Sequence, residues 1–330
     1  MLAAGWWSFS STIRPAGSKA ESLEMTTPDP VRSKGGFDCT IVIPAYNAAS
    51  YVEETVHSAL AQDPEYPPVV IVVDDGSSDN TLELVQNIPG VTAVQQKNGG
   101  RAAACNTGLD MATTTFVMFL DSDDTLLPGA LEAHLRAFGT HPHAVMVYGS
   151  NHVIDENGKR LESRQQPAFE TRDIERIAAS VTPCGSQVLY RRDAVNAAGK
   201  FDPTLRVSED VDMSLRLPDL GSIVCHGEFV MNYRRHGAQL TKRPSRICRT
   251  HLKVIARALG PHGRHPDAGA QRRVNAKWKA FYGQNIPAET IRHAAAGRFG
   301  ESLMAGTTFL KSLPYSGIGA MRMIARRISG

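Results

Sequence analysis

Residues 116–124 read FVMFLDSDD, in which five apolar residues are followed by four polar ones, three of them aspartate. An apolar run of this length that ends in polar residues is typical of a strand buried on both faces. Two earlier runs follow the same plan: Thr40–Ile43 ends at Pro44, and Val69–Val73 ends at Asp74-Asp75-Gly76. Since ligands bind beyond the carboxyl ends of parallel strands, these segments predict a sheet with polar residues gathered at one edge.

Helical patterns lie between these runs. Ser50 and Glu53 have the spacing of a capping box and precede a helix that stops at Asp63-Pro64, and two further helices follow the second strand and a third strand at Val91–Val94. The alternation predicts an α/β fold, a doubly wound, mostly parallel sheet flanked by helices. Later expectations are helices near 130–138 and 209–217, strands near 144–149 and 188–190, a hairpin turn at Asn157-Gly158, and only helices after Thr241.

The composition of the 330 residues is that of a soluble globular protein, with 42% apolar and 21% charged residues. No apolar run approaches the roughly 20 residues of a membrane-spanning helix. Five scattered cysteines without metal-binding spacing indicate a reducing compartment. Residues 1–36 lack the layout of a secretory signal and are expected to form a disordered leader, with Met25 as an alternative start. The expected location is therefore the cytoplasm.

Charge divides the chain into two regions. After residue 240 there are seventeen Lys or Arg against three acids, whereas the preceding residues hold nineteen bases and thirty acids. This basic, helical region (241–330) is either a solvated surface or a face that meets anionic lipid or an anionic acceptor. Its amphipathic stretch Ile318–Ile328 would allow peripheral contact with the inner face of a membrane. A nucleic-acid partner is not expected, because aromatic residues are sparse there and no binding module is recognisable.

The acidic stretch after residue 120 suggests a metal site. Asp121 and Asp123 are one residue apart, so both side chains can point to one pocket, where they repel each other unless a cation lies between them. Carboxylate oxygens suit Mg²⁺ or Mn²⁺ together with substrate phosphates, and Asp124 is a further candidate ligand. The sequence has neither a dinucleotide-binding glycine motif nor a P-loop, so a metal held by aspartates is one remaining way to neutralise a diphosphate. A solvated Asp-rich turn is the alternative.

Six segments, in order, resemble glycosyltransferase family 2. They are Ile41–Asn47, Val73–Thr81, Phe119–Asp124, Gly199–Asp202, Ser208–Leu217 and Tyr233–His236, and the resemblance extends from about Cys39 to Thr241. It implies a GT-A fold over residues 37–240 and inverting transfer of a sugar from a nucleotide-diphosphate sugar to an acceptor hydroxyl. A carbohydrate or lipid-linked acceptor is implied, in the synthesis of a polysaccharide, a glycolipid or a cell-surface glycan. The Gln-x-x-Arg-Trp segment of processive members is absent, so we expect transfer of a single sugar.

The resemblance also implies roles for individual residues. Asp210 would be the general base, and its alternative is an acidic first turn that stabilises a helix dipole. His236 would contact the metal or the diphosphate beside Asp121, Asp123 and Asp124. The nucleotide sugar would be bound by Pro44, Ala45, Tyr46, Asn47, Asp74, Asp75, Arg101, Asn106, Asp121, Ser122 and Asp123. Cys105 stands where the family often has an arginine, so Arg101 or Lys97 would make the phosphate contact instead.

Two other classes of protein remain open. A nucleotidyltransferase acting on sugar phosphates also uses a parallel sheet and acidic metal ligands, but it normally has a glycine-rich basic loop after the first strand. A non-catalytic scaffold that binds nucleotide sugars would keep the fold without turnover. The base, the sugar, the acceptor and the linkage are not determined by the sequence.

Overall fold

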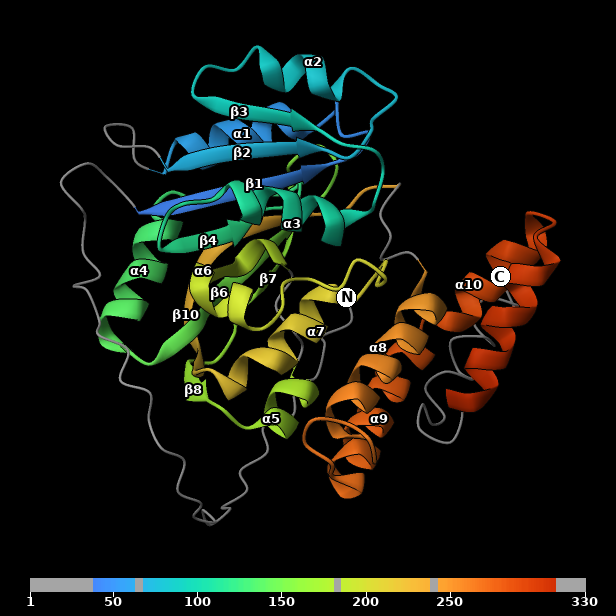
Figure 1. The fold of residues 1–330 in the computed structure, drawn as a ribbon. Coiled ribbons are helices and arrows are strands. Elements are labelled where there is room, and N and C mark those ends of the chain that lie inside the picture. The colour runs from blue at the N-terminus through green and yellow to red at the C-terminus, as the bar shows by residue number, and fades with distance from the viewer. Residues whose placement is uncertain (1–37, 63–67, 181–184, 238–242, 313–330) are drawn as a thin grey trace.

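The computed structural model describes residues 38–62, 68–180, 185–237 and 243–312, which form an α/β domain followed by helices (Figure 1). Ten strands make one sheet in the order β3-β2-β1-β4-β9-β6-β10-β5, with β7 on β6 and β8 on β10. The strands are β1 (Cys39–Ala45), β2 (Val69–Asp74), β3 (Val91–Gln95), β4 (Phe116–Phe119), β5 (Thr125–Leu126), β6 (Ala144–Ile154), β7 (Arg160–Arg164), β8 (Phe169–Thr171), β9 (Val188–Arg191) and β10 (Ser222–Arg234). The helices are α1 (Val52–Leu60), α2 (Thr81–Gln86), α3 (Arg101–Met111), α4 (Ala130–Thr140), α5 (Ile174–Ala179), α6 (Arg192–Ala197), α7 (Glu209–Arg216), α8 (Pro244–Leu259), α9 (Ala268–Gly283) and α10 (Ile286–Ala295).

The first half of the sheet is parallel, as predicted. β3, β2, β1 and β4 pair in parallel, and successive side chains of β1 enter two different apolar clusters. Val42 packs with Leu109 of α3, whereas Ile41 and Ile43 pack with Val56 of α1 on the other face. Helices therefore cover both faces of the sheet, which confirms the doubly wound α/β fold.

The second half of the sheet departs from the prediction. β9 runs antiparallel to both β4 and β6, and the longest strand, β10, lacks a clear alternating pattern and was not predicted. Gly227, at φ +82°, lies where β10 bulges between Cys225 and Phe229, so the strand reads as two short pieces. The predicted capping box at Ser50 was also wrong, because α1 begins at Val52 without a side-chain cap. The hairpin between β6 and β7 is confirmed.

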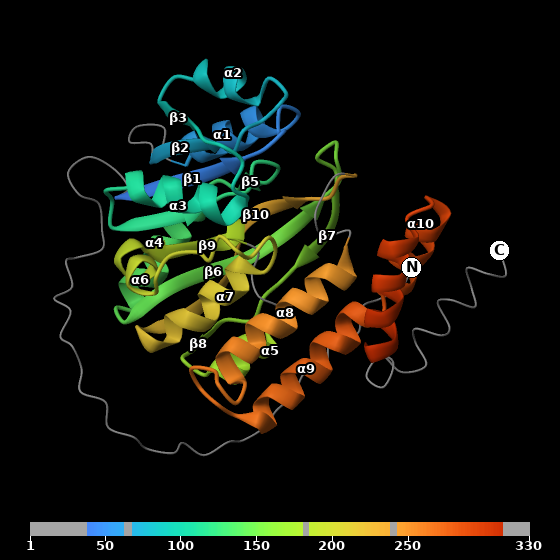
Figure 2. The ribbon, with the colours of Figure 1, turned by 45° about the vertical axis from the view of Figure 1, so that its right-hand side comes forward.

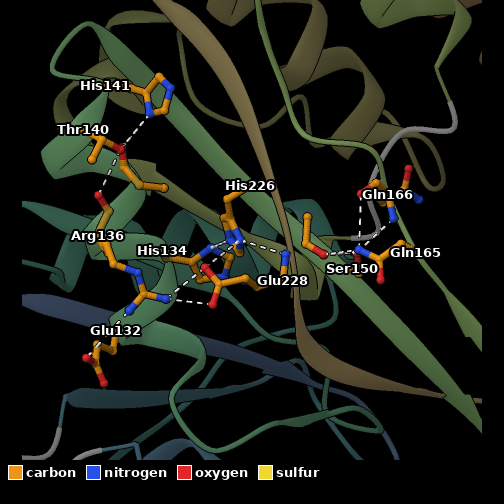
Figure 3. Close-up of polar contacts among 12 residues, drawn as sticks. Glu132, His134, Arg136, Thr140, His141, Ser150, Gln165, Gln166, His226 and Glu228 are labelled. Atoms are coloured by element: carbon orange, nitrogen blue, oxygen red, sulfur yellow. Dashed lines mark hydrogen bonds and ion pairs between the residues drawn. The ribbon is translucent and has the colours of Figure 1, made fainter.

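Figure 3 shows how α4 is held against the β10 bulge. The backbone N–H of Glu228 donates to Nδ1 of His226, so Nε2 of a neutral His226 carries the hydrogen that faces Nδ1 of His134 at 3.0 Å. Burial lowers the pKa of both histidines, which keeps the pair uncharged. Ser150 donates to the carbonyl of Gly227 across the bulge. These contacts fix one side of the sheet and lie away from the acidic loops.

The C-terminal extension is helical, as predicted. α8 packs on α7, α9 packs on α5, and residues 299–312 are helical as well (Figure 2). Trp278 fastens α9 to the main domain, because its indole N–H donates to the carbonyl of Ala178 at 2.7 Å. Within the described ranges, no helix has the length and apolar character needed to cross a bilayer. The predicted leader (1–36) and the amphipathic stretch Ile318–Ile328 lie outside the described residues.

Candidate active site

The loops after β1 and β2 are joined by hydrogen bonds, so the polar residues that follow these two strands lie together at one edge of the sheet. Oδ1 of Asn47 accepts from the backbone N–H of Ser78 at 2.8 Å, and the N–H of Ala48 donates to Thr81. Asn47 adopts φ +49°, a conformation that asparagine tolerates better than most residues. Pro44 and Ala45 end β1 beside Asp74, and the neighbouring Tyr46 is 54% exposed.

Asp74 and Asp75 hold the loop that enters α3. Asp75 accepts bonds from the backbone N–H groups of Gly99 and Gly100, at 2.8 and 2.7 Å, and from the side chain of Gln96. Asp74 accepts from Ser77 and Gln95 through Oδ2, while its Oδ1 is buried with no hydrogen-bond partner in the described part of the chain. Both carboxylates thus brace the loops around α3, and Asp74 retains an oxygen that can still accept a hydrogen bond.

The acidic loop after β4 places its three aspartates in different surroundings. The side chains of Asp121 and Asp123 are 30% and 25% exposed, whereas Asp124 is fully buried. The Asp124 oxygens accept from the backbone N–H of Arg234 at 2.9 Å and from the Ser186 hydroxyl at 2.7 Å. Burial, together with Asp123 and Asp121, raises the pKa of Asp124 well above its usual range. This placement favours a positioning role for Asp124 over the predicted role as metal ligand.

Asp123 pairs with His236. Nε2 of His236 lies 2.8 Å from Oδ2 of Asp123, and the imidazole packs on the ring of Tyr51. The Nε2 and Oδ2 atoms are hydrogen-bonded to each other, and the Asp123 carboxylate is a ligand type that suits Mg²⁺ or Mn²⁺. Among the described residues no group of three or more His, Cys, Asp or Glu side chains could hold a metal unaided. Phosphate oxygens of a donor would therefore have to complete such a site.

Arg101 connects the acidic loop to the helix that carries Asp210. Its Nε lies 2.5 Å from Oδ1 of Asp121, and its Nη1 lies 3.1 Å from Oε1 of Glu209. Nη2 is buried without a hydrogen-bond partner in the described part of the chain. One guanidinium thus joins two segments that are 88 residues apart.

Asp210 lies in the first turn of α7, next to this ion pair. Burial and the neighbouring carboxylate of Glu209 raise its pKa to about 7, although the Arg101 guanidinium opposes the rise. Ser208, the residue before α7, adopts φ +63°, which is uncommon for serine and is typical of functional loops. A partly buried carboxyl that titrates near neutrality is well suited to take a proton from a substrate.

Comparison with known proteins shows the family of the main domain and its fold. Residues 40–199 match the family model described as Glycosyl transferase family 2. Residues 40–199 form a glycosyltransferase family 2 domain. It is 31% identical over 232 residues to a chondroitin synthase of Escherichia coli, which covers 68% of this chain and 33% of that protein. It is 30% identical over 233 residues to a hyaluronan synthase of Pasteurella multocida, which covers 68% of this chain and 23% of that protein.

The match spans a third or less of these two relatives. Among solved structures, S. aureus TarS 1–349 superimposes with a TM-score of 0.54 at 17% identity, over 83% of this chain and 92% of that one. The complex of the same fragment with UDP gives a TM-score of 0.55 at 18% identity, over the same shares. The likeness confirms the GT-A fold and the C-terminal helices that follow it.

Asn106 of this family 2 domain differs from its predicted role. Asn106 donates to the carbonyl of Phe201 and accepts from its N–H, so its amide positions the loop before α7 and is not directed at a nucleotide. Cys105 is fully buried. Arg101 lies one helical turn before Cys105 and reaches the acidic loop, which supports Arg101 as the replacement for the family arginine.

Three residues outside the predicted set of site residues shape the site. Ser186 accepts from the backbone N–H of Asp121 and donates to Asp124. Glu209 holds Arg101, and Arg234 is 2% exposed with its Nε bonded to the carbonyl of Asp123. Burial turns Arg234 inward, whereas the adjacent Arg235 is exposed. A single serine or glutamate carries no sequence pattern that would have identified it.

Proposed function

We propose that the chain transfers a sugar from a nucleotide-diphosphate sugar to an acceptor hydroxyl, with inversion at the anomeric carbon. The single observation that carries this proposal is the Arg101 bridge. The bridge joins the acidic loop, which we propose faces the donor diphosphate, to the helix that carries the proposed base Asp210. Such coupling suits a one-step displacement, in which the leaving diphosphate and the attacking hydroxyl must be held in line.

Asp210 is proposed as the general base. With a pKa of about 7, about half of the Asp210 side chains are ionised at neutral pH, so the group can accept a proton and release it again. The loss of the acceptor proton to Asp210 creates the nucleophile at the moment of attack. Arg101 and Glu209 hold the first turn of α7, and so they orient the carboxylate without contacting the acceptor.

The donor is proposed to bind at the loops after β1, β2 and β4. Pro44, Ala45, Tyr46, Asn47, Asp74 and Asp75 surround the place for the nucleoside, and Arg101, Asp121, Ser122 and Asp123 that for the diphosphate. Asp123, His236 and Asp121 would hold Mn²⁺ or Mg²⁺ together with phosphate oxygens. When bound, the cation would neutralise charge on the leaving diphosphate. The complexes of S. aureus TarS with UDP and with UDP-GlcNAc make a uridine nucleotide the first donor to test.

The biological setting and the division of the chain are proposals as well. The names of the relatives favour polysaccharide synthesis over glycolipid synthesis, and the absent Gln-x-x-Arg-Trp segment favours transfer of one sugar per encounter. We assign catalysis to residues 37–240 and acceptor or membrane contacts to residues 241–330. In the helix 299–312, Phe299, Leu303 and Leu310 are exposed on one face, opposite the buried Ala305 and Thr308. Lys and Arg outnumber the acidic residues in residues 241–330, so an anionic bilayer is the partner that fits this face.

The test is the substitution Asp210→Asn. It keeps size and donor contacts but removes the base, so UDP affinity should stay within about twofold while transfer falls at least about a hundredfold. NMR of the product anomer with the wild-type enzyme tests inversion directly. Near-normal transfer by Asp210→Asn would exclude Asp210 as the base. Release of pyrophosphate from a nucleoside triphosphate would favour a nucleotidyltransferase, and donor binding without turnover would favour a scaffold.

A further inference from the structure

An aromatic group that the proposed mechanism does not use lies at the end of α9. The ring of Tyr282 stacks on that of Trp278 with centroids 5.6 Å apart and an angle of 24°. Phe281 stands nearly perpendicular to both, at 5.5 Å from Trp278 and 5.2 Å from Tyr282. Trp278 is buried and bonded to the main domain, so the group is rigidly attached. Phe281 is 48% exposed, and it offers an open aromatic surface on a fixed base.

The aromatic group lies at the same end of the molecule as the base. α8 and α9 form an antiparallel hairpin, so the last turn of α9 lies beside the first turns of α8, which follow the end of β10 (Figure 2). α7 packs on α8 and begins at Glu209, next to the acidic loop. Burial raises the pKa of the Tyr282 hydroxyl, and the Asp210 carboxylate raises it further. Tyr282 is therefore within electrostatic reach of Asp210.

The position of this group favours the acceptor over the donor. The loops proposed for the nucleoside follow β1 and β2, whereas α7 is bound to Arg101 through Glu209 and packs on α8, which packs on α9. A group that enters between α9 and Asp210 would approach the base directly. This region also carries the carboxylates of Glu209 and Asp210, so an anionic group would be repelled there.

The chemistry of the surface points to a sugar ring. One face of a pyranose consists mainly of C–H bonds, which pack well on the electron-rich face of an aromatic ring. The hydroxyl groups at the rim of the same ring can reach a carboxylate such as Asp210. The partly exposed phenyl ring of Phe281 packs on Tyr282, which senses the charge of Asp210, so the group offers both kinds of contact that an attacking sugar needs.

We infer that Phe281 and Tyr282 form an acceptor subsite, at which a neutral pyranose stacks on the aromatic group with one hydroxyl directed to Asp210. The inference rests on the proposed function, since it names the class of acceptor for that reaction. It commits to a sugar as the group that enters the site, and a lipid part of the acceptor would lie beyond it.

The experiment compares Phe281→Ala, the conservative Phe281→Tyr and the control Ile291→Ala in the full chain. Ile291 is 50% exposed on α10 of the same extension and has no role in the subsite. Transfer from UDP-GlcNAc to a panel of neutral methyl pyranosides is measured, together with UDP affinity. Phe281→Ala should raise the acceptor KM about tenfold, equivalent to ~1.4 kcal/mol, with kcat and UDP affinity nearly unchanged. Phe281→Tyr should restore the wild-type KM, and Ile291→Ala should keep it.

A second readout separates this inference from the proposed function. Saturation-transfer NMR detects contact between the same pyranosides and the protein without any turnover. Loss of the signal in Phe281→Ala alone would support the subsite even if no transfer occurred with the donor used. Equal signals in the wild type and Phe281→Ala, or an unchanged acceptor KM, would overturn it.

Discussion

The Arg101 bridge makes the pH dependence of turnover a sharp test of the site. If Asp210 acts in its ionised form with a pKa of about 7, about a tenth of the enzyme is active at pH 6 and about nine-tenths at pH 8. The value of kcat/KM for the wild type should therefore rise about tenfold between these pH values. Replacing Arg101 with Met removes the cation that opposes the rise of the Asp210 pKa. The acid limb of the profile should then move to higher pH.

The assay measures kcat/KM from pH 5.5 to 9.5 for the wild type, Arg101→Met and Arg136→Met. Arg136 also pairs with carboxylates, those of Glu132 and Glu228, but it lies on α4 away from the site, so its removal should leave the profile unchanged. Arg101→Met should lose most activity at pH 6 to 7 and recover part of it at pH 9. A flat wild-type profile between pH 6 and 8, or an acid limb that does not move in Arg101→Met, would refute the reasoning.

Two further predictions concern stability and the C-terminal helices. Burial lowers the pKa of His251 to about 4, below the 6.5 of an exposed histidine, so the unfolded chain binds the proton first as the pH falls. The free energy of unfolding should therefore drop by about 3 kcal/mol between pH 6.5 and 4, and urea unfolding of His251→Phe should lack this share; an equal loss in both proteins would contradict it. The triple substitution of Phe299, Leu303 and Leu310 by Ser should abolish co-sedimentation with anionic vesicles at low salt while transfer in solution persists. Sedimentation of the triple variant equal to that of the wild type, or no sedimentation of the wild type, would count against membrane contact.

The parallel part of the fold could be predicted because its information is local. The strands β1, β2 and β4 are short apolar runs that end in polar residues, and α1 has clear apolar spacing. β10 could not be predicted in the same way, because Gly227 and its bulge interrupt the pattern within the strand. Its neighbours in the sheet come from distant segments, and pairing of that kind leaves no mark in the strand itself.

The candidate site shows the same contrast between local sequence patterns and contacts between distant segments. The loops of Asp75, Asp123 and Asp210 were found because motifs at strand and helix ends carry them. The distinction between Asp123 and Asp124 depends on burial by Ser186 and Arg234, which arrive from segments more than 60 residues away. The structural use of Asn106 likewise depends on the backbone of Phe201, which only the folded chain brings into contact. Sequence motifs thus locate the candidate site, and contacts between distant segments decide which side chains are exposed in it.

The central claim is that Asp123 and its neighbours hold a divalent cation that binds the donor diphosphate. Isothermal titration of UDP into the wild type and Asp123→Ala, each with Mn²⁺ and then with EDTA, tests it most directly. The account predicts that Mn²⁺ tightens UDP binding to the wild type at least about tenfold, or ~1.4 kcal/mol, and leaves Asp123→Ala unaffected. Equal UDP affinity of the wild type with Mn²⁺ and with EDTA would contradict it.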